Sequence, residues 1–185
     1  MRVLTASIGL ALCGVLTVGN STFPKGPEKG AAFSFSNVPY FHRYSKNEMH
    51  EYTPSGQEHR KAWKDLVTIN RYPRVKDGKA LAATFSIVLE RYKAAGGMAI
   101  QAASLPKGKP TDYLIGAVFS RPGFLEASFV RFRMHKGVGI SVTYSHHIYG
   151  KGVGDAMSAW LKKNSVVTLT NLMKWDQVPE LSAPK

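Results

Sequence analysis

Residues 111–150 contain three segments rich in β-branched and aromatic residues, separated by two short glycine-containing turns. The segments 113–119, 124–134 and 138–149 are typical of β-strands. Ser120–Gly123 places a proline and a glycine at the two central positions of a tight turn. The stretch therefore predicts an antiparallel meander of three strands, against which the rest of the chain must pack.

The apolar pattern predicts the register of the second and third strands. Setting Met134 opposite Ile140 places Phe132 opposite Val142 and aligns the apolar side chains on one face. A two-residue loop at Lys136–Gly137 would instead place Phe132 opposite a serine. Because a slip of one residue turns every side chain of a strand to the other face, we expect the longer turn.

A helix is expected to cover the apolar face of this meander. Asp77 is a suitable cap at its start, and Gly96 suits the position after its end. In the first hairpin of the meander, the pairing of Arg121 with Phe124 places the apolar residues of both strands on one face, and this is the face that the helix is expected to cover. The helix over residues 78–95 has an apolar stripe at spacings of three and four, formed by Leu81, Thr84, Phe85, Val88, Leu89 and Tyr92.

A second helix is expected to start near Asp155, with Met157, Trp160 and Leu161 on its apolar side. These patterns predict an α+β fold, a curved and mainly antiparallel sheet of about six to seven strands packed by two longer helices. The order of strands, helix, strands and helix resembles that of the Mog1/PsbP-like sandwich. That resemblance covers most of the mature chain as an order of elements and implies an accessory or binding protein, without assigning a role to any residue.

The N-terminus predicts export. Arg2 precedes an uncharged, mostly apolar run that ends in small residues, so residues 1–20 are expected to be a signal peptide. Cys13 is the single cysteine, and Leu12 before it argues against lipid anchoring there. We expect residues 21–30 to be an exposed tether, 31–175 one α+β domain and 176–185 a loose tail. The expected location is the periplasm or beyond it, and the mature chain has no disulfide.

The chain carries a formal net charge of +13. A strongly basic protein attracts anionic ligands, anionic membrane surfaces and acidic proteins. Export argues against nucleic acid as a partner. The side chains expected to form a basic ligand-binding surface are Arg131, Arg133, His147, Lys151, Lys107 and Lys109.

The expected register also suggests a catalytic cluster. It places Ser128 opposite His146, with Glu126 two residues away on the same face. A histidine can activate a serine when a carboxylate orients the imidazole. The six histidines have no spacing typical of a zinc site, so neither a metal nor another cofactor is expected.

These observations favour an exported binding or accessory protein that does no covalent chemistry and presents a basic surface to an anionic ligand or protein. Whether it is an enzyme stays open, since a hydrolase using Ser128, His146 and Glu126 is the first alternative. A periplasmic inhibitor or immunity protein is the second. The aromatic residues between Phe33 and Tyr52 have two interpretations, packing at the sheet edge or a concave ligand site lined by rings.

Overall fold

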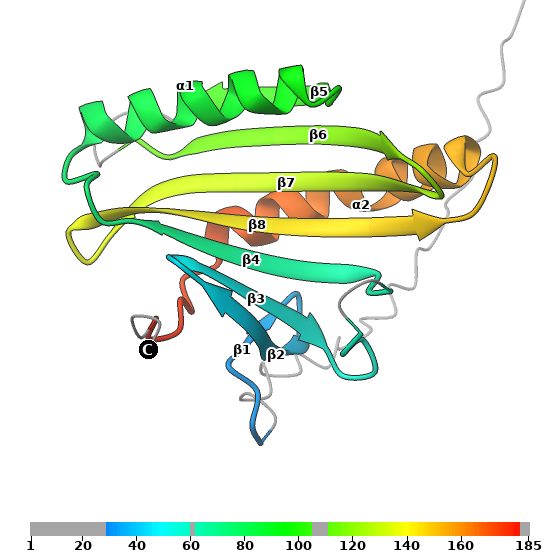
Figure 1. Cartoon of the computed structure of the whole chain (residues 1–185), viewed down its shortest axis with the longest axis horizontal. Coiled ribbons are helices and arrows are strands. Elements are labelled where there is room, and N and C mark those ends of the chain that lie inside the picture. Colours follow the sequence, from blue (N-terminus) through cyan, green and yellow to red (C-terminus); the bar gives the residue numbers. More distant parts are fainter. Residues whose placement is uncertain (1–28, 60–61, 105–110, 182–185) are drawn as a thin grey trace, which may run out of the picture.

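The computed structural model of the chain describes residues 29–59, 62–104 and 111–181. The predicted signal peptide and most of the predicted tether lie outside these ranges. Within them, the chain forms one open sheet with a helix on each side (Figure 1). The elements are β1 (Phe33–Phe35), β2 (Val38–Lys46), β3 (Met49–Pro54), β4 (Asp65–Tyr72), α1 (Gly78–Ala94), β5 (Met98–Ser104), β6 (Tyr113–Arg121), β7 (Phe124–His135), β8 (Val138–Tyr149) and α2 (Gly154–Lys174).

The sheet has eight strands in the order β1-β2-β3-β4-β8-β7-β6-β5, and every neighbouring pair is antiparallel. The α+β class and the antiparallel sheet are therefore confirmed, with more strands than predicted. Strand β8 returns to pair with β4, so the meander of β6, β7 and β8 and the strands β1 to β4 form one continuous surface. Parts of the chain far apart in sequence thus meet at the β4–β8 junction.

Both predicted helices are present. The Oδ1 atom of Asp77 accepts a hydrogen bond from the backbone N–H of Ala80 at 2.8 Å, which caps the start of α1 as predicted. Gly96 follows the helix with a φ of +78°, a conformation that glycine adopts without strain. Helix α2 is continuous, and Met157 and Leu172 near its two ends are both buried.

The predicted register is right for the first hairpin of the meander and wrong for the second. Arg121 pairs with Phe124 as expected. At the second turn, however, Lys136 and Gly137 form the two-residue loop that the apolar pattern disfavours, and Phe132 lies opposite Ser141. Both loop residues have positive φ, +46° and +77°, which matches the right-handed twist of the flanking strands.

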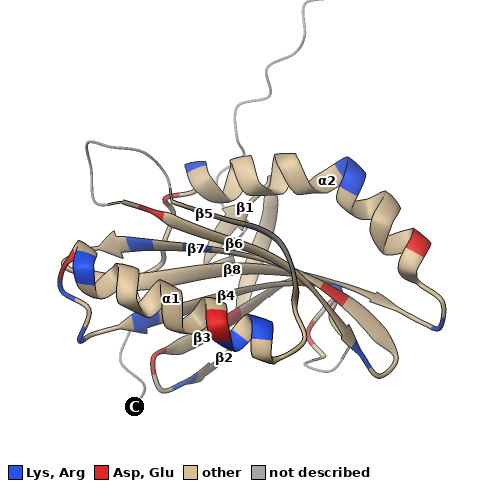
Figure 2. Cartoon of the chain, turned by 90° about the horizontal axis from the view of Figure 1, so that it is seen from above, with Lys and Arg blue, Asp and Glu red and all other residues tan. Residues whose placement is uncertain are grey.

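The physical reason for this error is that both faces of the sheet are buried (Figure 2). Helix α1 covers Val130 and Phe132 of β7, whereas α2 covers Ile140 and Val142 of β8. The apolar residues of the two strands therefore point to opposite sides. The expectation that α1 covers one shared apolar face holds for β6 and β7 and fails for β8.

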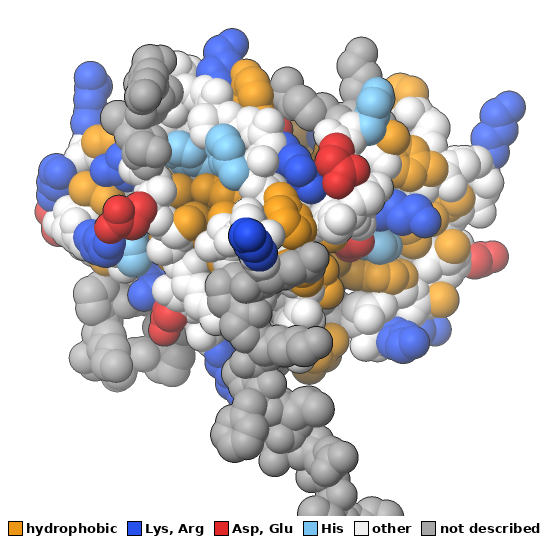
Figure 3. Space-filling view, turned by 90° about the horizontal axis from the view of Figure 1, so that it is seen from below, with side chains coloured by type: hydrophobic (Ala, Val, Ile, Leu, Met, Phe, Trp, Pro, Cys, Tyr) orange, Lys and Arg blue, Asp and Glu red, His pale blue; other side chains and the backbone are white. Residues whose placement is uncertain are grey.

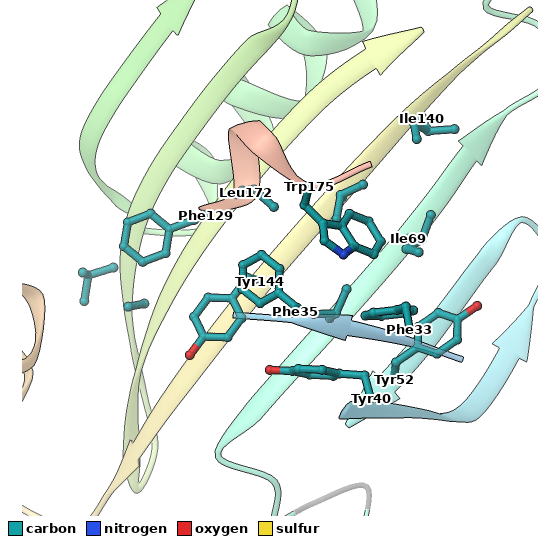
Figure 4. Packing of buried hydrophobic residues seen from close by; sticks show 14 of the residues in the cluster. Phe33, Phe35, Tyr40, Tyr52, Ile69, Phe129, Ile140, Tyr144, Leu172 and Trp175 are labelled. Carbon is teal, nitrogen blue, oxygen red and sulfur yellow. The ribbon is translucent and has the colours of Figure 1, made fainter. Parts of the chain in front are cut away.

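A cluster of aromatic rings joins the end of α2 to the first strands (Figure 4). Trp175 lies 4.8 Å from Phe33 between ring centroids, and its Nε1–H donates to the backbone oxygen of Ser34 at 2.9 Å. Beyond it, Val178 and Leu181 pack against the same core. Residues 176–181, which the sequence predicted to be part of a loose tail, are thus in contact with the domain.

Candidate functional site

The predicted catalytic cluster is divided between the two faces of the sheet. Glu126 pairs with His147, and Ser128 lies two residues along β7 on the same, α1-covered face. His146 pairs with Ala127 and points to the opposite face, because successive residues of a strand alternate. Glu126, Ser128 and His146 therefore do not meet. The cause is the one-residue register error at the turn between β7 and β8.

His146 has a different carboxylate partner. Its Nδ1 lies 2.8 Å from Oδ1 of Asp65, and the hydroxyl of Tyr144 donates to the same oxygen at 2.7 Å. The imidazole also stacks on Trp160 of α2, with centroids 4.2 Å apart and planes at 5°. The sequence analysis missed Asp65, because the residue is brought to His146 only by the pairing of β4 with β8.

The surroundings of Asp65 keep its carboxyl group ionised. Burial alone would raise the pKa of this group, but hydrogen bonds from His146, Tyr144 and Gln57 outweigh it and lower the pKa below its ordinary value of 3.8. Burial and the nearby carboxylate together raise the pKa of Tyr144, so that this hydroxyl keeps its proton. A carboxylate that holds one ring nitrogen of a histidine selects the imidazole's orientation.

His147 occupies a matching position on the other face. Its ring lies between Trp63, with centroids 3.6 Å apart, and Phe124, at 4.3 Å. Its Nδ1 is 3.0 Å from the hydroxyl of Tyr149, and its Nε2 is 3.5 Å from Oε2 of Glu126. Burial would raise the pKa of Glu126, but contacts with His147 and Ser145 lower it. The sequence predicts that His147 contacts a ligand. Because its imidazole is buried, a ligand cannot reach it.

Arg131 has a structural role rather than a ligand-binding one. Its guanidinium side chain is 8% exposed and contacts Oδ2 of Asp112 through Nε at 2.8 Å and Nη2 at 2.7 Å. Its Nη1 donates to the backbone oxygens of Leu172 at 3.1 Å and Trp175 at 3.0 Å. These carbonyls belong to the last turn of α2 and to the residue that follows it, where backbone acceptors lack partners within the helix. Arg131 therefore fastens the end of α2 to the sheet.

The other residues of the predicted basic surface do not form one patch. Arg133 is paired with Asp176 beside the end of α2. Lys151 is exposed at the opposite end of the sheet, between β8 and α2. Lys107 and Lys109 lie outside the described residues. The structure thus separates this set because Arg131 and Arg133 face α2, while His147 faces the side of α1.

Cations from several turns gather instead at one end of the sheet, which we term the cationic end. The backbone N–H of Arg71 donates to the oxygen of Glu48 at 2.9 Å, and that of Gly139 to the oxygen of Val75 at 2.8 Å. These bonds bring together the β2–β3, β4–α1 and β7–β8 turns at one end of the sheet (Figure 1). On the face seen from below, Lys and Arg side chains are spread among Asp and Glu side chains (Figure 3). The cationic end contains Lys46, Arg71, Arg74, Lys76, Lys79, Arg133 and Lys136.

A cavity of about 320 Å³ opens at the cationic end. One side is formed by Arg71, His135 and Lys136, and another by apolar side chains of β8 and of the segment after α2. Glu180 is the acidic residue of its described lining, and it contacts Lys136 only at 4.0 Å. The sequence analysis missed this cavity because its walls come from three separate parts of the chain.

A further polar chain lies on β2 and β3. The hydroxyl of Ser45 is 2.7 Å from Nε2 of His42 and 2.7 Å from Nδ1 of His50. Burial and the neighbouring His42 lower the pKa of His50. In the described part of the chain, no group of three or more His, Cys, Asp or Glu side chains is arranged to hold a metal ion. Nor is any described helix long and apolar enough to cross a membrane.

The described part of the chain is an open-sheet α+β domain with a cavity at its cationic end. No known family model matches the chain, and no curated protein matches its sequence. A mutant of the protein Mog1 is similar in structure, with a TM-score of 0.48 and 9% identity over 73% of this chain and 84% of that one. The Saccharomyces cerevisiae Ran-binding protein Mog1p has a TM-score of 0.45 and 12% identity over 74% and 85% of the two chains. Human STARD10 has a TM-score of 0.28 and 13% identity over 74% of each chain.

Mog1 belongs to the group whose element order the sequence resembles. The similarity of these structures concerns the arrangement of strands and helices alone. We therefore infer no partner and no activity for this chain from them.

Proposed function

We propose that the protein is an exported, non-catalytic binding protein that takes an anionic partner at its cationic end. The observation that carries this proposal is the gathering of seven basic residues there, of which Arg71, Arg133 and Lys136 are paired with carboxylates and three others are not. Arg74, Lys76 and Lys79 have no acidic partner among the described residues, and Asp77 between them is engaged as the cap of α1. Cations held in excess on one surface attract anions and raise the rate of encounter.

The neighbouring pairs leave much of this charge accessible. Arg71 contacts Glu48 at 3.2 Å, with both side chains partly exposed, and Lys136 and Glu180 are both highly exposed. Exposed pairs of this kind are held together by about 1 kcal/mol or less, so an anion can compete for the cation. The cavity beside Arg71 and Lys136 offers a recess in which an anionic group can be partly desolvated.

Binding experiments at low and physiological salt test this function. The purified protein is titrated with vesicles that contain anionic lipid, with vesicles of neutral lipid and with a polyglutamate peptide. We expect binding to an anionic probe that weakens steeply as salt is added. The anionic vesicles and the peptide distinguish a membrane surface from an acidic protein as the partner.

Charge reversal provides a matched comparison. The triple variant Arg74→Glu, Lys76→Glu and Lys79→Glu should weaken binding by about tenfold or more, which corresponds to about 1.4 kcal/mol. The control variant Lys151→Glu, Lys162→Glu and Lys163→Glu changes the net charge equally at exposed positions away from the cationic end. Equal weakening by both variants, or no binding to any anionic probe at low salt, would contradict the proposal.

A second candidate function is a hydrolase that uses His146. One observation favours it, because Asp65 holds Nδ1 of His146 in the manner of the carboxylate in a catalytic dyad. A panel of generic ester and glycan substrates tests it. Hydrolysis that disappears in His146→Ala and has a weakened pH dependence in Asp65→Asn would support catalysis. Hydrolysis that survives in His146→Ala would exclude His146 as the base.

A further inference from the structure

A second cavity, of about 370 Å³, lies between α2 and the first strands. Its walls include Phe35 and Tyr40 from the N-terminal strands, Asp65 and Tyr144 from β4 and β8, and Trp160 and Val167 from α2. Val38 and Val167 line it and are exposed, so the cavity opens to solvent between them. This volume lies in the range of small-molecule sites, roughly 300–1,000 Å³.

The charge of this cavity is opposite to that of the protein. Asp65 is the one charged residue among the described residues that line it, although the chain carries a net charge of +13. The lowered pKa of Asp65 keeps the carboxylate ionised. A partly buried carboxylate that contacts the imidazole of His146, with no Lys or Arg among the described residues of the cavity wall, favours a positively charged ligand.

Asp65 also has capacity for one more donor. Its Oδ1 accepts from Tyr144 and contacts His146, whereas Oδ2 accepts only from Nε2 of Gln57, at 3.2 Å, among the described residues. A carboxylate has about four acceptor positions on its two oxygens. A ligand that donates a hydrogen bond to Oδ2 would therefore complete the coordination of this group.

Tyr40 places a second hydroxyl group at the cavity. The residue is 2% exposed and is part of the cavity wall. Burial and the charge of Asp65 raise its pKa, so the hydroxyl stays protonated. Tyr40 and Tyr144 direct their hydroxyl ends to the same side of the aromatic cluster (Figure 4).

Aromatic rings form part of the remaining wall, beside aliphatic residues and the polar Ser36, Asn164, Thr168 and Asn171. Phe35 lies 6.3 Å from Tyr40 and 5.3 Å from Tyr144 between ring centroids, and Trp160 lines the cavity from the side of α2. Ring faces attract ammonium groups through their negative electrostatic potential, by about 0.5–2 kcal/mol for each contact. Aromatic walls around a carboxylate thus combine the two features that bind an amine.

We infer that this cavity binds a small organic cation, an ammonium group carried on an apolar or aromatic body. The ammonium donates to Asp65 and lies beside the hydroxyl of Tyr40, and the apolar body extends toward Val38 and Val167. This site is distinct from the cationic end and has the opposite charge preference. Binding of an amine in this cavity is therefore independent of binding of an anion at the cationic end.

Calorimetric titration with three probes of nearly the same shape tests the inference. Phenethylamine, phenethyl alcohol and phenylacetate differ in the charge of one terminal group. We expect the amine to bind at least about tenfold more tightly than the alcohol, and the acid not to bind. Equal binding of the amine and the alcohol, preference for the acid, or no binding of the amine would overturn the inference.

Two adjacent residues of α2 provide the control. Val166 and Val167 are 75% and 50% exposed, but only Val167 lines the cavity. Val167→Lys should weaken amine binding by about fivefold or more by repulsion at the entrance, whereas Val166→Lys should leave it unchanged. Both variants add the same charge at exposed positions, so the fold is retained. Equal effects would place the amine elsewhere and overturn the inference.

Substitutions inside the cavity separate the two polar contacts. Asp65→Asn should remove the preference for the amine over the alcohol. Tyr40→Phe should weaken binding of the amine by several-fold, while the preference for the amine over the alcohol remains. Circular dichroism and thermal unfolding identify any variant that fails to fold. An amine preference that persists in folded Asp65→Asn would show that this carboxylate does not recognise the ligand.

Discussion

Arg131 and Arg133 lie two positions apart on β7, and their surroundings give them different roles. Arg131 is buried against Asp112 and the carbonyls that end α2, whereas Arg133 pairs with Asp176, whose side chain is 71% exposed. A buried guanidinium with several acceptors is part of the packing. The alternating pattern of β7 does not reveal which basic residue is covered, because that depends on where α2 ends.

We predict that Arg131→Met destabilises the protein by about 3 kcal/mol, since it leaves Asp112 and two backbone carbonyls without their donor. Arg133→Ala should cost about 1 kcal/mol or less, because its pair is exposed. Chemical unfolding of both variants gives the comparison. Similar losses for the two would show that Arg131 does not fasten α2.

The lowered pKa values of Asp65 and Glu126 predict a loss of stability in acid. Their ordinary values are 3.8 and 4.5, and the folded state favours the ionised form of both. The stability they contribute is therefore present above about pH 4.5 and is lost as the pH falls through their folded values. The free energy of unfolding should fall as the pH is lowered from about 6 to about 3. They should fall less steeply in Asp65→Asn, and an unchanged slope in that variant would contradict the assignment.

At the scale of elements, the β7–β8 turn determines which face each strand of the meander presents. Lys136 and Gly137 both have positive φ, and this two-residue turn pairs His135 with Val138. Lysine is not the preferred residue at the first position of such a turn, for which asparagine is better suited. The turn is therefore a place where sequence preference and the observed conformation differ.

Substitutions at these two positions should have opposite effects. Lys136→Asn is expected to stabilise the protein by about 0.5 kcal/mol, because asparagine accepts positive φ more readily. Gly137→Ala should destabilise it by about 1 kcal/mol, since a Cβ is strained at a φ of +77°. Denaturant midpoints give both values. A stabilising Gly137→Ala would indicate that the loop has another conformation in solution.

At the scale of the whole molecule, Trp175 links the end of helix α2 to the first strand of the sheet. It follows α2 directly and packs against Phe33 and Phe35 of β1, the first strand of the sheet. β1 consists of three residues, and among the described strands it pairs with β2 alone, so it depends on this contact. The short strand and the C-terminal segment therefore stabilise each other.

We predict that Trp175→Ala destabilises the protein by about 3–5 kcal/mol through the lost packing and the lost bond to Ser34. Amide hydrogen exchange in β1 and β2 should accelerate more than in β7 and β8. Trp175→Phe retains part of the packing and should have a smaller effect on both. Exchange that accelerates equally across the sheet would contradict a local link.

Much of the architecture could be predicted from local patterns. The apolar stripe and the Asp77 cap determined α1, and the proline and glycine of the first hairpin determined its register. The composition of the strands indicated an antiparallel α+β fold. These features follow from propensities and spacings within a few neighbouring residues, and such information is present in the sequence itself.

Only the tertiary structure decided which side chains meet. An alternating strand has the same pattern whichever face is buried, and here helices bury both faces. The partner of His146 therefore changed from Ser128 to Asp65 when the register moved by one residue. Both cavities likewise combine residues from distant segments, since the pairing of β4 with β8 and the docking of α2 bring them together.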